Sequence, residues 1–214
     1  MKESLILVFM KYRFLIIIPV YALLSMTFSS CNEGEKCPEG INLLPMYGKV
    51  QKCKEQLESD KRFLDLSDKE NPDRASATIK TIDNGWYYLH QGDYETAMKR
   101  INQAWLLDST NILVYASFAV ILDLTHKTDD AIKMLDLTFE KIHSMEEPEE
   151  PSRMNPGKKE FTEFVVSNAP FTYKKTNNAV IGKYLYAKLD SLDITEPDKA
   201  MLKNKLKTEI PDLP

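Results

Sequence analysis

The side chains best suited to chemistry in this sequence belong to three cysteines and three histidines. They are Cys31, Cys37, Cys53, His90, His126 and His143. Paired thiols can form a disulfide and clustered cysteine and histidine can bind zinc, but these residues do not show the spacing of zinc ligands. The sequence also lacks the common motifs of serine hydrolases, zinc proteases and phosphate-binding loops. We therefore expect no metal, no cofactor and no enzyme activity, with each histidine at the surface or in a groove.

An export signal precedes the first cysteine. The basic residues Lys11 and Arg13 are followed by an apolar run of 11 residues, Phe14–Leu24. That length suits the core of a signal peptide and is too short to span a bilayer. Residues 1–30 are therefore expected to be a signal peptide. Translation is expected to start at Met10 rather than at Met1, because both positive charges would then directly precede the apolar run.

The run Phe28-Ser29-Ser30-Cys31 resembles a lipobox, in which a small residue precedes a cysteine that becomes acylated. The two serines fit the pattern, whereas Phe28 stands where leucine is usual. The resemblance implies a lipid anchor on Cys31, in which each buried CH₂ group contributes about 0.8 kcal/mol. It also implies an outer-membrane lipoprotein facing the periplasm or the cell surface, since no aspartate follows to indicate retention in the inner membrane. An uncleaved membrane anchor and a plain secreted protein are the alternatives.

With Cys31 acylated, Cys37 and Cys53 would remain as an even pair in an oxidising compartment. A bridge between them would close a loop of about 15 residues and contribute about 3 kcal/mol in the chain-entropy model. Two free thiols are the alternative, and the sequence leaves both open.

The charge of the chain excludes one class of partner. The net charge is −4, from 28 basic and 32 acidic residues, and it becomes −6 when the three basic residues and one acidic residue of 1–30 are removed. Affinity for nucleic acid comes mainly from basic groups that neutralise phosphates. We therefore expect no nucleic-acid partner.

Apolar periodicity and capping residues predict an all-α fold behind this anchor. Residues 31–51 are expected to be the lipidated tether, with an extended lead-in over Ile41–Tyr47 that resembles the lead-in of other exported bacterial proteins. A helical domain over 52–143, a loop over 144–176 and a C-terminal helical hairpin over 177–214 follow. Within the loop, Phe161–Val166 is open between strand and helix. Helices are predicted at 52–66, 73–91, 94–107, 111–125, 129–143, 177–192 and 197–208.

Similar residues recur 34 positions apart in the middle of the chain. The pairs are Gly85 and Ala119, Ala97 and Ala131, Ile101 and Leu135, and Trp105 and Phe139. This period and the stretch from Gly85 to Ala97 resemble the tetratricopeptide repeat (TPR). The resemblance implies about two antiparallel helix pairs of TPR type, in which the small residues let two helices approach closely. Because each repeat needs neighbours to bury its faces, the flanking helices are expected to act as caps.

In the tetratricopeptide family the first helix of each pair lines a concave groove. Carried onto this sequence, the resemblance implies a groove formed by Ile79, Ile82, Asp83, Trp86, Leu89, His90, Leu113, Ala116, Ser117, Val120, Asp123 and Leu124. This set is largely apolar and suits a partner helix or strand. The alternative is that the chain's own segment Phe161–Tyr173 fills the groove.

These expectations favour a membrane-anchored lipoprotein that acts as a protein-interaction scaffold and binds an unidentified protein of the cell envelope. An inhibitor or immunity-type lipoprotein that neutralises an envelope toxin is the second hypothesis. The acidic run Glu146–Glu150 would suit a basic toxin, although such a run is more often a solvated loop.

Overall fold

The computed structural model describes residues 36–151, 156–211 and 213–214. The chain divides into two compact units, Met1–Cys37 and Pro38–Pro214. The expected signal peptide and residues 31–35 of the tether, Cys31 among them, lie outside the described residues. The fold given below is that of the second unit, described by itself.

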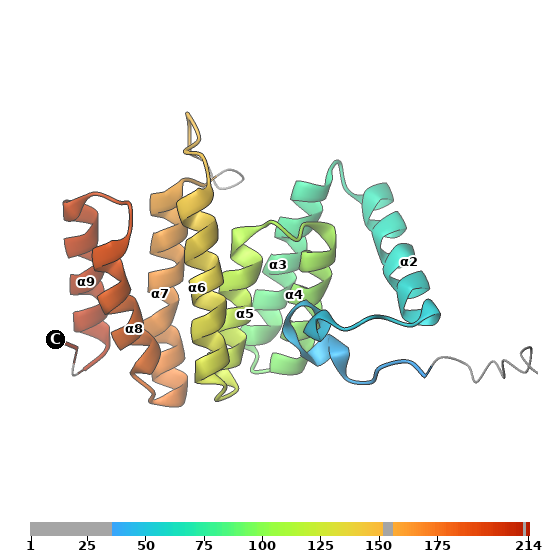
Figure 1. The fold of residues 1–214 in the computed structure, drawn as a ribbon, viewed down its shortest axis with the longest axis horizontal. Coiled ribbons are helices and arrows are strands. Elements are labelled where there is room, and N and C mark those ends of the chain that lie inside the picture. Colours follow the sequence, from blue (N-terminus) through green and yellow to red (C-terminus); the bar gives the residue numbers. More distant parts are fainter. Residues whose placement is uncertain (1–35, 152–155, 212) are drawn as a thin grey trace, which may run out of the picture. The chain divides into compact units, whose positions relative to one another are not determined.

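The described part of the second unit is all-α, as predicted. Figure 1 shows the α-helices and the segments that connect them. The described residues also form three 3-10 turns. In chain order the elements are η2 (Ile41–Leu43), η3 (Pro45–Lys49), α2 (Lys54–Glu70), α3 (Arg74–His90), α4 (Tyr94–Leu107), α5 (Ile112–Leu124), α6 (Thr128–Ser144), α7 (Lys158–Thr176), α8 (Val180–Lys188), η4 (Leu189–Ser191) and α9 (Glu196–Glu209). Among the described residues, no helix has the length and apolar character needed to cross a membrane.

Short polar side chains begin the central helices, and α4 has the predicted bounds. The carboxylate of Asp93 accepts a hydrogen bond from Thr96 N at 3.0 Å at the start of α4. The amide oxygen of Asn111 accepts one from Leu113 N at 3.0 Å at the start of α5. Such caps satisfy backbone N–H groups that have no partner inside the helix.

At two other helix starts the neighbouring polar residues have different roles. Asn71 ends α2, and the cap of α3 is Asp73, which accepts a hydrogen bond from Ser76 N at 2.7 Å. Thr128 is the first residue of α6 and not its cap. Its hydroxyl donates to Asp123 Oδ1 at 3.2 Å instead. A side chain that finds a hydrogen-bond acceptor elsewhere in the fold need not cap the helix next to it.

Helices α3 and α4 pack closely because Gly85 lies at their contact. A Cβ atom at this position would stand 2.6 Å from Ile101 Cδ1, which is closer than real carbon atoms approach. The residue 34 positions after Gly85 is Ala119, which lies in the next helix pair, α5 and α6. Ala119 is 3% exposed. The small residues therefore lie at buried helix contacts, as expected of them.

Helix α5 is buried on every side. All of its residues except Leu113 are buried, including Phe118 at 0% exposure. Helices α3, α4, α6 and α7 all pack against it. A helix that is apolar all round requires such an environment, and α5 is therefore the centre of the core.

The loop predicted over 144–176 is wrong for its second half, because residues 158–176 form the helix α7. Phe161, Val165 and Ala169 are buried at i, i+4 spacing, which is a helical pattern. The prolines before Gly157 indicated a loop, and Pro170 inside the helix concealed its length. Proline is costly within a helix, but the packing of α7 against α5, α8 and α9 outweighs that cost here.

The flanking helices expose some of their apolar side chains. Helix α2 runs to Glu70 rather than residue 66, and its Leu57 is 55% exposed. Helix α9 buries Leu202 and Leu206, but its Met201 is 45% exposed. Both helices lie at the ends of the helical row and are covered on fewer sides than α5 (Figure 1).

The lead-in is a compact left-handed turn rather than an extended segment. Met46, Tyr47, Gly48 and Lys49 have consecutive positive φ angles of 53°, 54°, 67° and 55°. Met46 and Tyr47 are buried, and the Tyr47 ring lies 6.4 Å from the ring of Trp105 on α4. L-residues rarely adopt this conformation because Cβ approaches the following carbonyl oxygen. Tertiary contacts therefore determine this turn.

Candidate functional site

Five of the predicted groove residues line one cavity. Ile79, Ile82, Asp83 and Trp86 of α3 and Leu113 of α5 border a space of about 500 Å³. Its other described walls are Pro151, Pro156 and three residues of α7, namely Glu160, Phe161 and Phe164. We call this space the α3–α5–α7 cavity. Its volume lies in the range of sites that bind small molecules or anchoring side chains, about 300–1,000 Å³.

Helix α7 covers much of the rest of the predicted groove, although His90 stays exposed. The ring of His90 lies 5.2 Å from Phe171 and 5.8 Å from Trp86. Val120 and Asp123 border a separate space of only about 20 Å³, whose walls include Val165, Ala169 and Thr172 of α7. Leu89 is buried in the core at 2% exposure, as are Ala116, Ser117 and Leu124. The chain's own segment therefore occupies much of this part, and the end near Ile79 borders the larger of the two spaces.

The wall of the cavity is held by a chain of contacts around Trp86. The indole Nε1 donates a hydrogen bond to Ser117 Oγ at 2.9 Å. The Ser117 hydroxyl donates in turn to Leu113 O at 2.7 Å. The Trp86 ring also meets Phe164 edge to face, with 5.7 Å between ring centroids. Because the indole N–H is satisfied within the protein, a ligand in the cavity need not supply an acceptor for it.

The α7 wall was predicted only as an alternative, in which Phe161–Tyr173 fills the groove. Glu160, Phe161 and Phe164 fall within the region predicted as a loop, and Phe161–Val166 was open between strand and helix. The available signal was the spacing of Phe161, Phe164 and Val165, which places them on one face of a helix.

A buried carboxylate lies beneath α7. Asp123 is 1% exposed, its Oδ1 accepts the hydrogen bond from Thr128, and its Oδ2 has no hydrogen-bond partner in the described part of the chain. Burial raises the pKa of Asp123, while the hydroxyls of Thr172 and Thr128 partly oppose this effect. A buried carboxylate that lacks a full set of partners favours its neutral form.

This carboxylate predicts a pH-dependent effect of Asp123→Asn. The folded state favours protonated Asp123, so its contribution to stability is complete below the pKa of the unfolded carboxyl group. That contribution is lost as pH rises through the higher pKa of the folded state. The variant should therefore match the parent near pH 4 and be more stable by about 1–2 kcal/mol at pH 8. Urea unfolding at several pH values measures this, with exposed Asp129→Asn as control; a difference that does not change with pH contradicts it.

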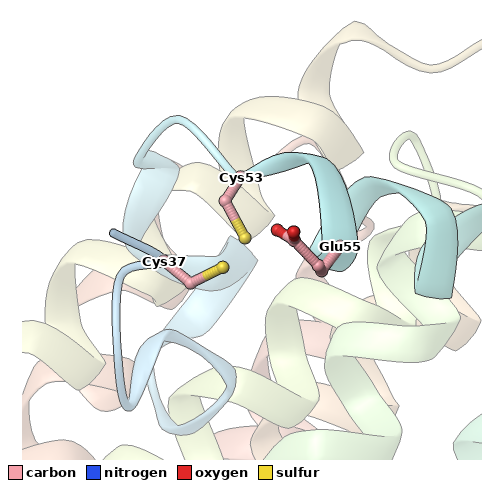
Figure 2. A group of neighbouring side chains, drawn as sticks. All are labelled: Cys37, Cys53 and Glu55. Carbon is pink, nitrogen blue, oxygen red and sulfur yellow. The ribbon is translucent and has the colours of Figure 1, made fainter. Parts of the chain in front are cut away.

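Cys37 and Cys53 are both disulfide-bonded. Figure 2 shows them as neighbouring side chains together with Glu55. Cys53 is 2% exposed and directly precedes α2, where its backbone N–H donates to Gln56 Oε1 at 3.2 Å. These three residues are the one group of potential metal ligands in the described residues. Zinc requires thiolates, and a disulfide offers none.

The histidines lie on separate elements. His90 belongs to α3 and His143 to α6, while His126 stands in the turn between α5 and α6 with a φ of 60°. All three are exposed. In the tetratricopeptide pattern, glycine is usual at the position of His126. The positive φ of His126 explains this preference, because glycine adopts positive φ without strain.

The chain was also compared with known proteins. No family model matches it, and neither a curated protein nor a solved structure shows significant similarity to it.

Proposed function

We propose that the protein is a membrane-anchored lipoprotein of the outer membrane that acts as a protein-interaction scaffold with helix pairs of TPR type. The observation that carries this proposal is the α3–α5–α7 cavity, because its walls include the helix faces with which such repeats bind their partners. Five residues that the resemblance assigns to the groove, among them Trp86 and Leu113, border this cavity.

The arrangement of the helices supports the repeat. Each of the pairs α3/α4 and α5/α6 packs more extensively within itself than against the next pair. Of the residues that recur after 34 positions, Ala97 and Ala131 are both 0% exposed, and Ile101 and Leu135 are 1% and 4% exposed. These equivalent positions have equivalent burial, which is expected of stacked repeats, whereas Trp105 is half-buried and Phe139 is 3% exposed.

Site-specific crosslinking in living cells tests the scaffold. A photoreactive phenylalanine analogue at position 83, at the cavity, should give a covalent adduct with an envelope protein. The matched control is the analogue at position 201, which is exposed on α9. An adduct at position 83 and none at position 201 supports the proposal. No adduct at position 83, or equal adducts at both positions, contradicts it.

The second candidate is an inhibitor that neutralises a basic toxin in the envelope. Glu146, Glu147, Glu149 and Glu150 are exposed between α6 and α7, with no basic residue among residues 144–151. The identity of the crosslinked protein separates the two hypotheses: a stable component of the envelope supports the scaffold, and one basic secreted protein supports the inhibitor.

A further inference from the structure

The small space beside the buried carboxylate of Asp123 has the size of a water site. It measures about 20 Å³ and lies among residues of α5, α6, α7 and α8. Every residue that lines it is buried except Asn168, which is half-buried. A space of at least about 10–15 Å³ can hold one water molecule. This space therefore has room for a water and is too small for an organic ligand.

Three of the residues that line the space are polar, and each offers an acceptor. Asp123 is 1% exposed, and its Oδ2 has no hydrogen-bond partner in the described part of the chain. The buried hydroxyl of Thr172 donates to Ala169 O at 3.1 Å, so its oxygen can still accept. Asn168 Nδ2 donates to Phe164 O at 2.8 Å, and the amide oxygen of Asn168 can accept. Acceptors from α5 and α7 thus converge on one small space.

The number of polar residues decides between a water molecule and a metal ion. A buried water makes about two to four hydrogen bonds, which these side chains can supply. Ca²⁺ takes about six to eight oxygen ligands and Mg²⁺ about six, whereas the other side chains that line the space are apolar. A water also suits both charge states of Asp123, because it can donate to a carboxylate and accept from a carboxyl group.

We infer that this space binds one internal water molecule, which forms hydrogen bonds to Asp123 Oδ2 on α5 and to the polar side chains of α7. Buried polar groups almost always have a partner, either in the protein or in ordered water. The water supplies that partner for Asp123 Oδ2 and joins α5 to the helix that covers it.

This water completes a polar network that joins four helices. Asp123 Oδ1 accepts a hydrogen bond at 3.2 Å from Thr128 of α6, which itself accepts one at 2.9 Å from Asn178 Nδ2. The amide oxygen of Asn178 accepts from Val180 N at 3.0 Å, at the start of α8. With the water on Oδ2, the carboxyl group of Asp123 connects α5, α6, α7 and α8. The water thereby helps to hold α7 over the predicted groove.

A crystal structure of the full-length exported protein, at a resolution that shows ordered water, tests the inference. Density for one water should lie within about 3.2 Å of Asp123 Oδ2 and of Asn168 or Thr172. No density at this place, or a direct hydrogen bond from another protein group to Oδ2, overturns the inference.

Crystals soaked in thallium(I) acetate separate water from a monovalent cation, because thallium scatters anomalously. An anomalous peak in the space identifies a cation site and overturns the inference. Water density without an anomalous peak supports it.

The variant Ala119→Ser tests whether the space itself holds the water. Ala119 lines the space four residues before Asp123 on the same helix, so a hydroxyl at this position can reach Oδ2. Because the space has room for one water, the serine hydroxyl should displace it, and the water density should disappear. Ala187→Ser on exposed α8 surface is the matched control and should keep the water.

Circular dichroism verifies that both variants fold. A water that remains at Oδ2 in folded Ala119→Ser lies outside this space and overturns the inference. If Ala119→Ser does not fold, the density in the parent structure decides alone.

Discussion

Replacing Asn102 with leucine is expected to lower the free energy of unfolding by about 3 kcal/mol. The Asn102 side chain is 0% exposed and holds the lead-in through three hydrogen bonds. Its Nδ2 donates to Asn42 O at 3.0 Å and to Leu44 O at 2.8 Å, and its Oδ1 accepts from Tyr47 N at 3.2 Å. Leucine has nearly the same size but neither donates nor accepts. Each bond contributes about 1 kcal/mol net, and the buried groups left without a partner add to the loss.

The turn that Asn102 holds is strained, so losing these bonds should free the lead-in. Met46, Tyr47 and Lys49 each adopt left-handed backbone at a cost of about 1–2 kcal/mol. The bonds of Asn102, the ring contact of Tyr47 with Trp105 and the Lys52 ammonium 3.1 Å from the centre of the Tyr47 ring offset this strain. Without Asn102 the balance favours release of the segment.

Urea unfolding measures the loss of stability, and hydrogen exchange of the amides in 41–50 shows whether the lead-in detaches. The matched control is Asn204→Leu on α9, where the side chain is exposed and the change should stay within about 0.5 kcal/mol. Equal losses in the two variants would mean that the Asn102 bonds contribute little.

Replacing Cys31 with alanine is expected to move the protein from the membrane fraction to the soluble fraction. This prediction follows from the proposed lipid anchor. One acyl chain gives only marginal membrane binding, whereas two or three chains hold a protein firmly. No helix in the described ranges has the properties of a membrane span, so the described structure offers no second anchor of that kind.

Fractionation and labelling with radioactive palmitate measure the effect. Ser30→Gly keeps a small residue before the cysteine and is the matched control, which should remain acylated and membrane-bound. Persistence of the Cys31→Ala variant in the membrane fraction would refute the lipid anchor. Its release together with loss of the palmitate label would support it.

The part of the fold that follows local rules was predictable. Helix α4 has the predicted bounds because Asp93 caps it and its apolar residues recur at helical spacing. Gly85 and Ala119 were expected at close helix contacts, and they lie there because a larger residue would clash or lose packing.

The part that depends on tertiary contacts was not predictable. Non-glycine residues rarely have positive φ, so nothing local in Met46 or Tyr47 indicates the turn that Asn102 holds 55 residues away. Helix α7 was left open between strand and helix over Phe161–Val166, because the partners that stabilise it lie on α5 and α9. The groove residues of α3 and α5 were therefore identified, while Phe161–Tyr173 was named only as an alternative occupant of the groove.

The hydrogen bonds between Asn102 and the lead-in also set an order of events during folding. Pairs such as α3/α4 and α5/α6 join neighbouring segments, and local contacts of this kind form quickly. Asn42 and Asn102 are 60 residues apart, and closing so long a loop has an entropic cost that delays the contact. The lead-in leaves the ribosome before α4 but has no binding site until α4 has been made and folded. The first segment of this unit to be synthesised is thus expected to be among the last to reach its native place.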